Sequence, residues 1–210
     1  MYKILIADDH PIVRRGLRQI LEETRFVMSV DEASNGREAI ELVKNGKFDI
    51  VLLDISMPGM NGLEVMEELR RLKPSLPVLI LSIYPEEEYA VRALKAGAAG
   101  YLTKKSAPDE LVVAIKKLYK GERYISPSLA DYLASNLTDD KDKPLHKNLS
   151  NREFQVMRMI ASGKTLKEIA QEINLSPKTI STFRARILQK MHLKSNAELI
   201  QYAIKNKLDD

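Results

Sequence analysis

The sequence contains no cysteine among its 210 residues. A disulfide framework, a thiolate metal site and a cysteine nucleophile are therefore excluded. Long apolar runs are also missing, because the longest have the length of a strand and fall well short of the ~20 residues that a membrane-spanning helix needs. No signal-peptide pattern precedes the acidic pair Asp8 and Asp9. These absences predict a cytoplasmic protein that does not enter a membrane.

Charge is unevenly distributed, although the net charge of +4 is small. Residues 1–121 carry 18 basic and 18 acidic side chains, residues 122–147 carry 4 and 5, and residues 148–210 carry 11 and 6. The basic C-terminal third is a modest indication of a nucleic-acid partner, since a solvated helix can also be basic by chance. With 44% hydrophobic and 30% charged residues, the chain has the balance of a soluble protein of two small domains.

Short apolar runs alternate with helical periodicity from residue 1 to about 121, which is typical of βα units around a parallel sheet. Strands are predicted near 2–7, 27–33, 49–54, 77–82 and 99–103, and helices near 11–23, 36–45, 62–72, 86–96 and 108–120. The pattern predicts an α/β domain over 1–121.

The alternation of predicted strands and helices ends at residues 122–147. We predict this segment to be a linker with a short helix from Pro127 to about Ser135. Residues 137–144 are polar without an apolar period. The pattern is helical over 148–210, where four helices are predicted to begin near Ser150, Leu166, Lys178 and Ser195. This part is predicted to be a small all-α domain.

Polar side chains stand where four of the predicted strands end: Asp8 with Asp9, Asp54, Ser82 and Lys104. Ligands of open α/β sheets bind beyond the carboxyl ends of the strands, and a flavodoxin-like order 2-1-3-4-5 would bring the three carboxylates together. Three carboxylates repel one another unless a cation joins them, and oxygen ligands suit Mg²⁺. Asp54 is then a candidate nucleophile, with Lys104 and Ser82 placed to hold phosphoryl oxygens.

These motifs resemble the receiver domain of two-component response regulators along the whole of residues 1–121. The resemblance rests on the acidic pair, on Asp54 followed by Ile-Ser-Met-Pro-Gly-Met-Asn-Gly, on Ser82, and on Gly-Tyr-Leu-Thr before Lys104. It implies a flavodoxin-like fold with a five-stranded parallel sheet. It further implies that a partner histidine kinase phosphorylates Asp54, that Asp8, Asp9, Asp54 and the Ser56 carbonyl bind Mg²⁺, and that Ser82 and Tyr101 report the phosphoryl group to the surface. Such a receiver is no enzyme beyond assisting its own phosphorylation and dephosphorylation.

Residues 148 to about 206 resemble the helix-turn-helix DNA-binding domain of the LuxR, NarL and FixJ regulators. The resemblance rests on Leu-Ser-Asn-Arg-Glu at 149–153, Gly-Lys-Thr-Leu-Lys-Glu-Ile-Ala at 163–170 and Leu-Ser-Pro-Lys-Thr-Ile at 175–180. Periodicity assigns Ile180, Phe183, Ile187 and Met191 of the third helix to the core. The opposite side is predicted to bind double-stranded DNA. The family pattern implies that Ser181, Thr182 and Ala185 read bases, and Lys178, Thr179, Arg184 and Arg186 are assigned to phosphates. Arg184 leans toward the core side, so a surface arginine without DNA contact is an equal alternative.

The three histidines carry less information. His10 follows the acidic pair and could touch the site, but the start of a helix is the favoured interpretation. His146 and His192 lack partners at metal-ligand spacing, so a metal role is not expected.

The leading hypothesis is a transcription regulator that phosphorylation switches, either by promoting a homodimer or by releasing the DNA-binding domain. One rival is a phosphohydrolase of the haloacid-dehalogenase type, which needs Asp-x-Asp where this chain has Asp54-Ile55-Ser56. Another is a DNA-binding protein whose receiver serves only for dimerisation. The complete acidic pocket with Lys104 and Ser82 disfavours this second rival.

Overall fold

The computed structural model describes residues 1–135, 144–206 and 208. The chain divides into two compact units, Met1–Asn136 and Leu137–Asp210. Of the polar stretch predicted as a linker at 137–144, all but Pro144 lies outside the described residues.

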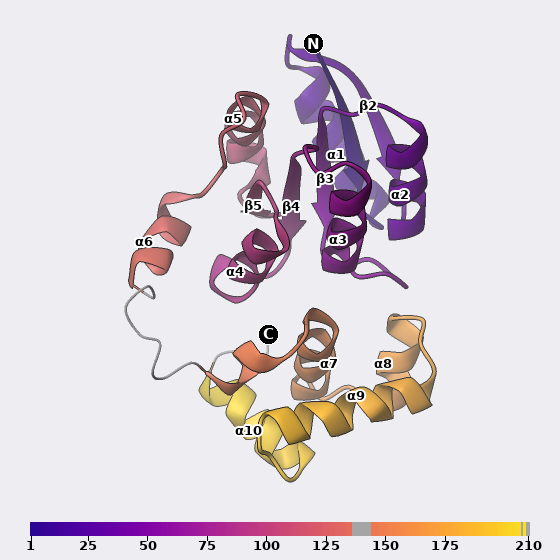
Figure 1. Cartoon of the computed structure of the whole chain (residues 1–210), viewed down its shortest axis with the longest axis vertical. Helices are drawn as coiled ribbons and strands as arrows, with labels where there is room; N and C mark the ends of the chain where they lie inside the picture. The colour runs from indigo at the N-terminus through magenta and orange to yellow at the C-terminus, as the bar shows by residue number, and fades with distance from the viewer. Residues whose placement is uncertain (136–143, 207, 209–210) are drawn as a thin grey trace. The chain divides into compact units, whose positions relative to one another are not determined.

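The first unit is built on one parallel sheet (Figure 1). Its strands are β1 (Tyr2–Ala7), β2 (Val27–Ala33), β3 (Ile50–Asp54), β4 (Val78–Ser82) and β5 (Gly100–Thr103), within one residue of the predicted ranges. All neighbouring pairs are parallel and the order is β2-β1-β3-β4-β5, which confirms the flavodoxin-like fold. This order places the carboxyl ends of β1, β3 and β4 side by side, where ligands bind in such sheets.

Five helices flank the sheet: α1 (Pro11–Glu22), α2 (Gly36–Asn45), α3 (Gly62–Leu72), α4 (Glu86–Ala96) and α5 (Ala107–Tyr119). Helix α1 packs against α5, while α2 packs against α3 and α3 against α4. Alternate strand residues form one core with α1 and α5, among them Ile4, Ile6, Ile50, Leu52, Leu79, Leu81 and Leu102. Because side chains alternate between the faces of a strand, the remaining apolar residues cover the other face, so the strands read as continuous apolar runs.

Helix α6 (Pro127–Ser135), which was predicted within the linker, packs on α4 and belongs to the first compact unit. Just before it, the Tyr124 N–H donates to the Ala99 carbonyl at 2.9 Å beside β5. The hydroxyls of Ser126 and Ser128 donate to the Glu86 carboxylate at 2.5 and 2.8 Å. These contacts hold the segment that follows α5 against the edge of the first unit.

The second unit contains the 3₁₀ turn η1 (Leu145–Asn148) and the helices α7 (Asn151–Ala161), α8 (Leu166–Glu172), α9 (Pro177–Lys190) and α10 (Asn196–Lys205). All four helices were predicted, and the side chains of Ser150, Thr165, Ser176 and Ser195 cap their N-termini. Such caps accept backbone N–H groups that have no partner within the helix. Between α8 and α9, Asn174 adopts φ 52°, the left-handed conformation that often ends a helix.

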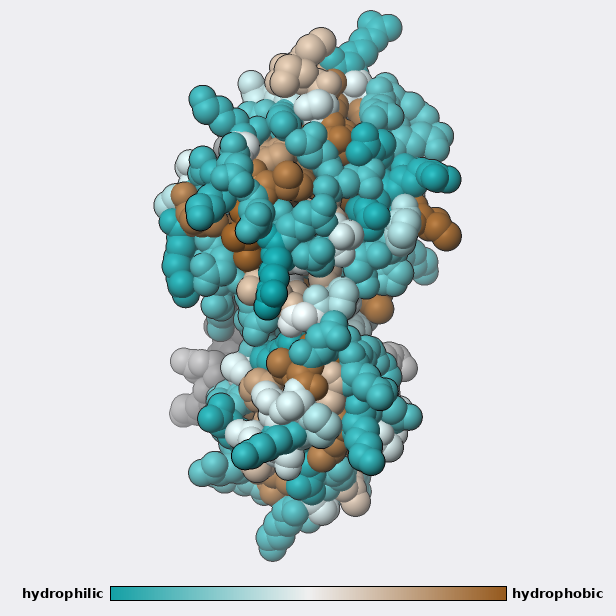
Figure 2. Space-filling model, turned by 90° about the vertical axis from the view of Figure 1, so that its right-hand side faces the viewer, coloured by the Kyte–Doolittle hydropathy of each residue, from teal (hydrophilic) through white to brown (hydrophobic). Residues whose placement is uncertain are grey.

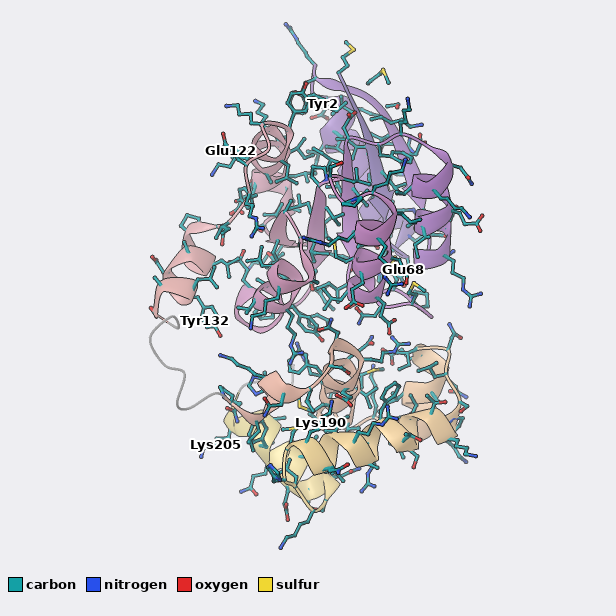
Figure 3. The ribbon with its side chains drawn as sticks, in the orientation of Figure 1. Tyr2, Glu68, Glu122, Tyr132, Lys190 and Lys205 are labelled. Carbon is teal, nitrogen blue, oxygen red and sulfur yellow. The ribbon has the colours of Figure 1, made fainter. Side chains whose placement is uncertain are left out.

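Glu153 ties α7 to the far end of α9. Its carboxylate accepts the Ser150 N–H at 2.8 Å and the ammonium group of Lys190 at 2.7 Å. Lys190 is labelled in Figure 3. Burial acts to raise the pKa of Glu153, but the bonds from Lys190 and Ser150 outweigh it and hold this pKa below its ordinary value. The ionised form is therefore the one that the folded domain prefers.

Replacing Glu153 by Gln is expected to destabilise the second unit at pH 7, by about 1.5 to 3 kcal/mol, the range for a hydrogen bond to a charged group. A carboxyl whose pKa is lowered on folding contributes its stability above the unfolded pKa and loses it as the pH falls. The gap between wild type and Glu153→Gln should therefore close below about pH 4. Amide hydrogen exchange of α7 at each pH measures this difference in stability. Glu172→Gln, which replaces an exposed carboxylate, is the control. A gap that stays constant with pH would contradict this assignment.

The surface is mostly hydrophilic on the face that Figure 2 shows, with apolar side chains in scattered patches. Within the described ranges, the structure contains no helix of the length and apolarity that crossing a bilayer requires.

Candidate functional site

The ends of β1, β3 and β5 bring two carboxylates and one ammonium group together. Asp8 and Asp54 are fully buried. The Lys104 Nζ lies 2.7 Å from Asp8 Oδ2 and 2.8 Å from Asp54 Oδ2. One cation thus bridges two buried carboxylates that come from different strands, as the strand order requires.

The charged groups of this bridge change one another's pKa. Burial raises the pKa of Asp54 and the nearby Asp8 adds to the rise, which the opposing effect of Lys104 does not cancel. Burial lowers the pKa of Lys104, but the two carboxylates outweigh burial and hold this pKa above its ordinary value. Lys104 is therefore charged at neutral pH, and a further cation would favour the ionised form of Asp54.

The residues of this pocket fit a divalent metal ion with oxygen ligands. Ligand atoms of Asp8, Asp9, His10 and Asp54 all lie within 4.8 Å of one another. Mg²⁺ prefers carboxylate oxygens and keeps part of its water shell, which suits a site where Asp9 is only half-buried. His10 is the N-cap of α1 and also approaches the site, since its Nδ1 lies 2.8 Å from Asp9 Oδ1 and 3.2 Å from Asp8 Oδ1.

Ser82 and Tyr101 both bond to Tyr84 in the loop after β4. Ser82 is fully buried, and its Oγ accepts the Tyr84 N–H at 3.0 Å. The carbonyl of the same Tyr84 accepts the Tyr101 hydroxyl at 2.9 Å. Ser82 also pairs with Thr103 in the sheet, and its carbonyl accepts the Lys104 N–H at 2.7 Å. The backbone of Tyr84 is thus the direct connection between Ser82 and Tyr101.

Gly62 allows the loop after Asp54 to fold back against β3. A Cβ atom at this position would lie 2.1 Å from the Asp54 carbonyl oxygen, far inside contact distance. The Gly62 N–H donates to the Ile55 carbonyl at 2.9 Å, and the Ser56 N–H donates to Asp54 Oδ1 at 3.1 Å. The Gly at the end of the Asp54 motif therefore has a steric reason, which the sequence pattern alone did not reveal.

A second candidate site is the outer face of α9 in the other unit. Ile180, Ile187 and Met191 are fully buried, as periodicity predicted, whereas Phe183, assigned to the same side, is only half-buried. The residues on the opposite side are exposed: Lys178, Ser181, Thr182, Ala185, Arg186 and Gln189. This face has two cations and no acidic residue, so it suits the phosphates and base edges of a major groove.

Three of the predicted DNA contacts have bonds within the unit. The Arg184 Nε donates to Asn196 Oδ1 at 2.6 Å, which joins α9 to α10 and explains why this half-buried arginine leans away from the outer face. The Thr182 hydroxyl donates to the Lys178 carbonyl at 3.0 Å, and the Thr179 and Ser176 hydroxyls lie 2.8 Å apart. Both threonine oxygens keep acceptor capacity.

Two contacts had no signal in the sequence. The Arg14 side chain donates to the backbone carbonyl of Asp8 at 2.7 Å. His146, in the 3₁₀ turn that was not predicted, places its Nδ1 2.9 Å from the Tyr202 hydroxyl of α10. Bonds to a backbone carbonyl or between distant elements follow no spacing rule, so only the fold reveals them.

Comparison with protein families matches both units. Residues 4–116 match the response regulator receiver domain, and residues 147–203 match the bacterial regulatory proteins of the luxR family.

Relatives match over nearly the whole chain. The response regulator UvrY of Escherichia coli strain K12 is 38% identical over 209 residues, which is 99% of this chain and 96% of that protein. The response regulator GacA of Pseudomonas aeruginosa is 37% identical over 212 residues, covering 100% and 99%.

Solved structures of RcsB from Salmonella resemble the present one over both units. One, described by its conformational dynamism for DNA interaction, has a TM-score of 0.72 at 28% identity and covers 97% of each chain. Another, bound to the promoter rprA in the presence of the phosphomimetic BeF₃⁻, has a TM-score of 0.68 at 29% identity and covers 96% and 98%.

Proposed function

The chain belongs to the two-component response regulators that join a receiver to a LuxR-type DNA-binding domain, and we propose that phosphorylation of Asp54 by a histidine kinase switches its DNA binding. The observation that carries this proposal is the Lys104 bridge between Asp8 and Asp54, at the strand ends where a phosphoryl group would be received. Phosphorylation would promote a homodimer or release the DNA-binding domain. A regulator of this kind acts where the DNA is, in the cytoplasm.

In the proposed reaction, an Asp54 carboxylate oxygen attacks the phosphorus of the phosphodonor, the donor's bond to phosphorus breaks, and an acyl phosphate forms. Asp8, Asp9, Asp54 and the Ser56 carbonyl would hold Mg²⁺, whose charge offsets the negative charge of the phosphoryl oxygens. Lys104 leaves its bridge to bind one phosphoryl oxygen, and the Ser82 hydroxyl donates to another. We propose no activity on a separate substrate, because these groups serve only Asp54's own phosphorylation and dephosphorylation.

The contact between Ser82 and Tyr84 supports a route from this reaction to the surface. A Ser82 hydroxyl that turns to a phosphoryl oxygen gives up its bond with the Tyr84 N–H. The loop can then shift, and with it the Tyr84 carbonyl that holds the Tyr101 hydroxyl. Tyr101 belongs to β5, which packs against α4, so the shift would reach the surface that these elements form.

The test of this function is DNA binding by the full chain with and without BeF₃⁻ and Mg²⁺. We expect wild type to gain affinity and Asp54→Asn to gain none. Ser82→Ala should still accept phosphate from acetyl phosphate but gain less affinity, because the route begins at its hydroxyl. A wild-type chain whose affinity BeF₃⁻ leaves unchanged would favour a receiver that serves only for dimerisation. Equal gains in Ser82→Ala and wild type would contradict the route alone.

Substitutions on α9 are expected to separate affinity from specificity. Lys178→Ala or Arg186→Ala should weaken binding to all sequences similarly and lower the salt slope by about one, since each removes one phosphate contact. Ser181→Ala or Thr182→Ala should alter base preference by ~1 to 3 kcal/mol at one position. Fluorescence anisotropy against several sites and KCl concentrations measures both effects. Lys205→Ala, which removes an exposed charge on α10, is the matched control and should change neither.

A further inference from the structure

The turn between β1 and α1 is held by a contact to its backbone. Arg14, one turn into α1, donates from Nη1 to the Asp8 carbonyl oxygen at 2.7 Å. That carbonyl belongs to the peptide group that joins Asp8 to Asp9. A hydrogen bond to it fixes the rotation of this peptide plane, and with it the directions in which both carboxylates leave the backbone.

Arg14 is itself held in place by a second contact. Its Nε donates to Glu32 Oε2 at 2.9 Å, and the other oxygen of Glu32 accepts the Arg18 Nε at 2.7 Å. Only 14% of the Arg14 side chain is exposed. Burial acts to raise the pKa of Glu32, but the two guanidinium groups outweigh it and hold this pKa below its ordinary value, so Glu32 is charged at neutral pH.

We propose that Arg14 is a positioning residue for the Mg²⁺ ligands Asp8 and Asp9, and that Glu32 on β2 holds Arg14 in this role. The proposal rests on the metal site of the proposed function. A planar guanidinium can donate to Glu32 and to the Asp8 carbonyl from two nitrogens in a fixed fork, whereas the donors of a lysine share one nitrogen and rotate freely.

Charge and positioning predict opposite effects for the loss of Arg14. Removing a cation from beside an acidic site makes the local potential more negative, which would strengthen Mg²⁺ binding. Releasing the peptide between Asp8 and Asp9 lets the two carboxylates adopt other orientations, which would weaken Mg²⁺ binding. Groups that orient metal ligands typically change metal affinity by 10- to 100-fold when they are lost. We therefore expect positioning to dominate.

Arg18 supplies the matched control. It pairs with the same Glu32, and no bond to Asp8 is among its described contacts. Arg18→Ala removes the same charge from the same carboxylate and leaves the Asp8 contact in place. Arg14→Lys keeps the charge and loses the fixed fork of the guanidinium, so it isolates geometry from charge.

The experiment titrates MgCl₂ into the full chain by isothermal calorimetry without a phosphodonor. We expect Kd to rise about tenfold in Arg14→Ala, to rise also in Arg14→Lys, and to stay within twofold of wild type in Arg18→Ala. Acetyl phosphate labelling should show the same shift in the Mg²⁺ concentration for half-maximal rate, with the rate at saturating Mg²⁺ retained. Helix circular dichroism verifies that each variant is folded, and Arg14→Lys decides the matter if Arg14→Ala is not.

The outcomes separate this proposal from the function on which it rests. Wild-type Kd in both Arg14 variants, or equal weakening in Arg18→Ala, would overturn the positioning role while the metal site stands. A wild-type chain that binds no Mg²⁺ would overturn the metal site and the positioning role together.

Discussion

Asp54→Asn is expected to accept no phosphate at all. Wild type incubated with acetyl phosphate and Mg²⁺ should gain one phosphoryl group per chain, because among the described carboxylates Asp54 alone has both the acidic pair and Lys104 beside it. An Asn side chain has neither the nucleophilic oxygen nor the negative charge that the reaction needs. Mass spectrometry of the intact chain measures the change.

The matched control is Asp49→Asn. Asp49 is an exposed residue immediately before β3, at the opposite end of the strand from Asp54, and its replacement should leave labelling intact. In Asp54→Asn, Lys104 keeps its partner Asp8, so the fold should survive and thermal unfolding can verify it. An unchanged mass increase in Asp54→Asn would end the hypothesis.

The strands and their order followed from a pattern that burial imposes. Strands covered on both faces must be apolar at every position, so Ile50–Leu53 stands out as a run and Asp54 marks its end. Once the order is flavodoxin-like, residues that end neighbouring strands must share one edge. The proximity of Asp8, Asp54 and Lys104 was therefore predictable without any knowledge of distances.

The contacts that orient these groups were not predictable in the same way. Arg14 reaches a carbonyl, Tyr101 reaches another, and Gly62 lies against a third. Every residue has a backbone carbonyl, so a contact to one cannot be recognised from the sequence. Ser126, likewise, has the appearance of a turn residue, and its bond to Glu86 forty positions earlier exists only because α6 packs on α4.

The outer face of α9 could be predicted only in part. Helical periodicity separated buried Ile180 and Ile187 from exposed Thr182 and Arg186, because one angle per residue decides which side faces the core. It could not decide whether Arg184 serves DNA or the fold. The bond to Asn196 shows that at least its Nε serves the packing of α10.

Phosphorylation is expected to raise DNA affinity only where two half-sites are present. Each chain has one helix, α9, with which to read DNA, the recognition helix. Useful affinity therefore requires two copies of the small basic domain on one DNA. A dimer makes the second binding event intramolecular, which can raise affinity by about 10² to 10⁴-fold without any new contact. We expect at least a hundredfold gain on paired half-sites, and little gain on a single one.

Anisotropy titrations of the acetyl phosphate-treated chain against single and paired half-sites of equal length provide the measurement. Asp54→Asn, treated in the same way, should bind both DNAs as the untreated wild type does. Spacing the half-sites by an extra half-turn of the duplex should abolish the gain, because the two recognition helices would then face opposite sides. An identical gain on the single half-site would show instead that phosphorylation frees a recognition helix within one chain, since release acts on each copy separately and needs no second site.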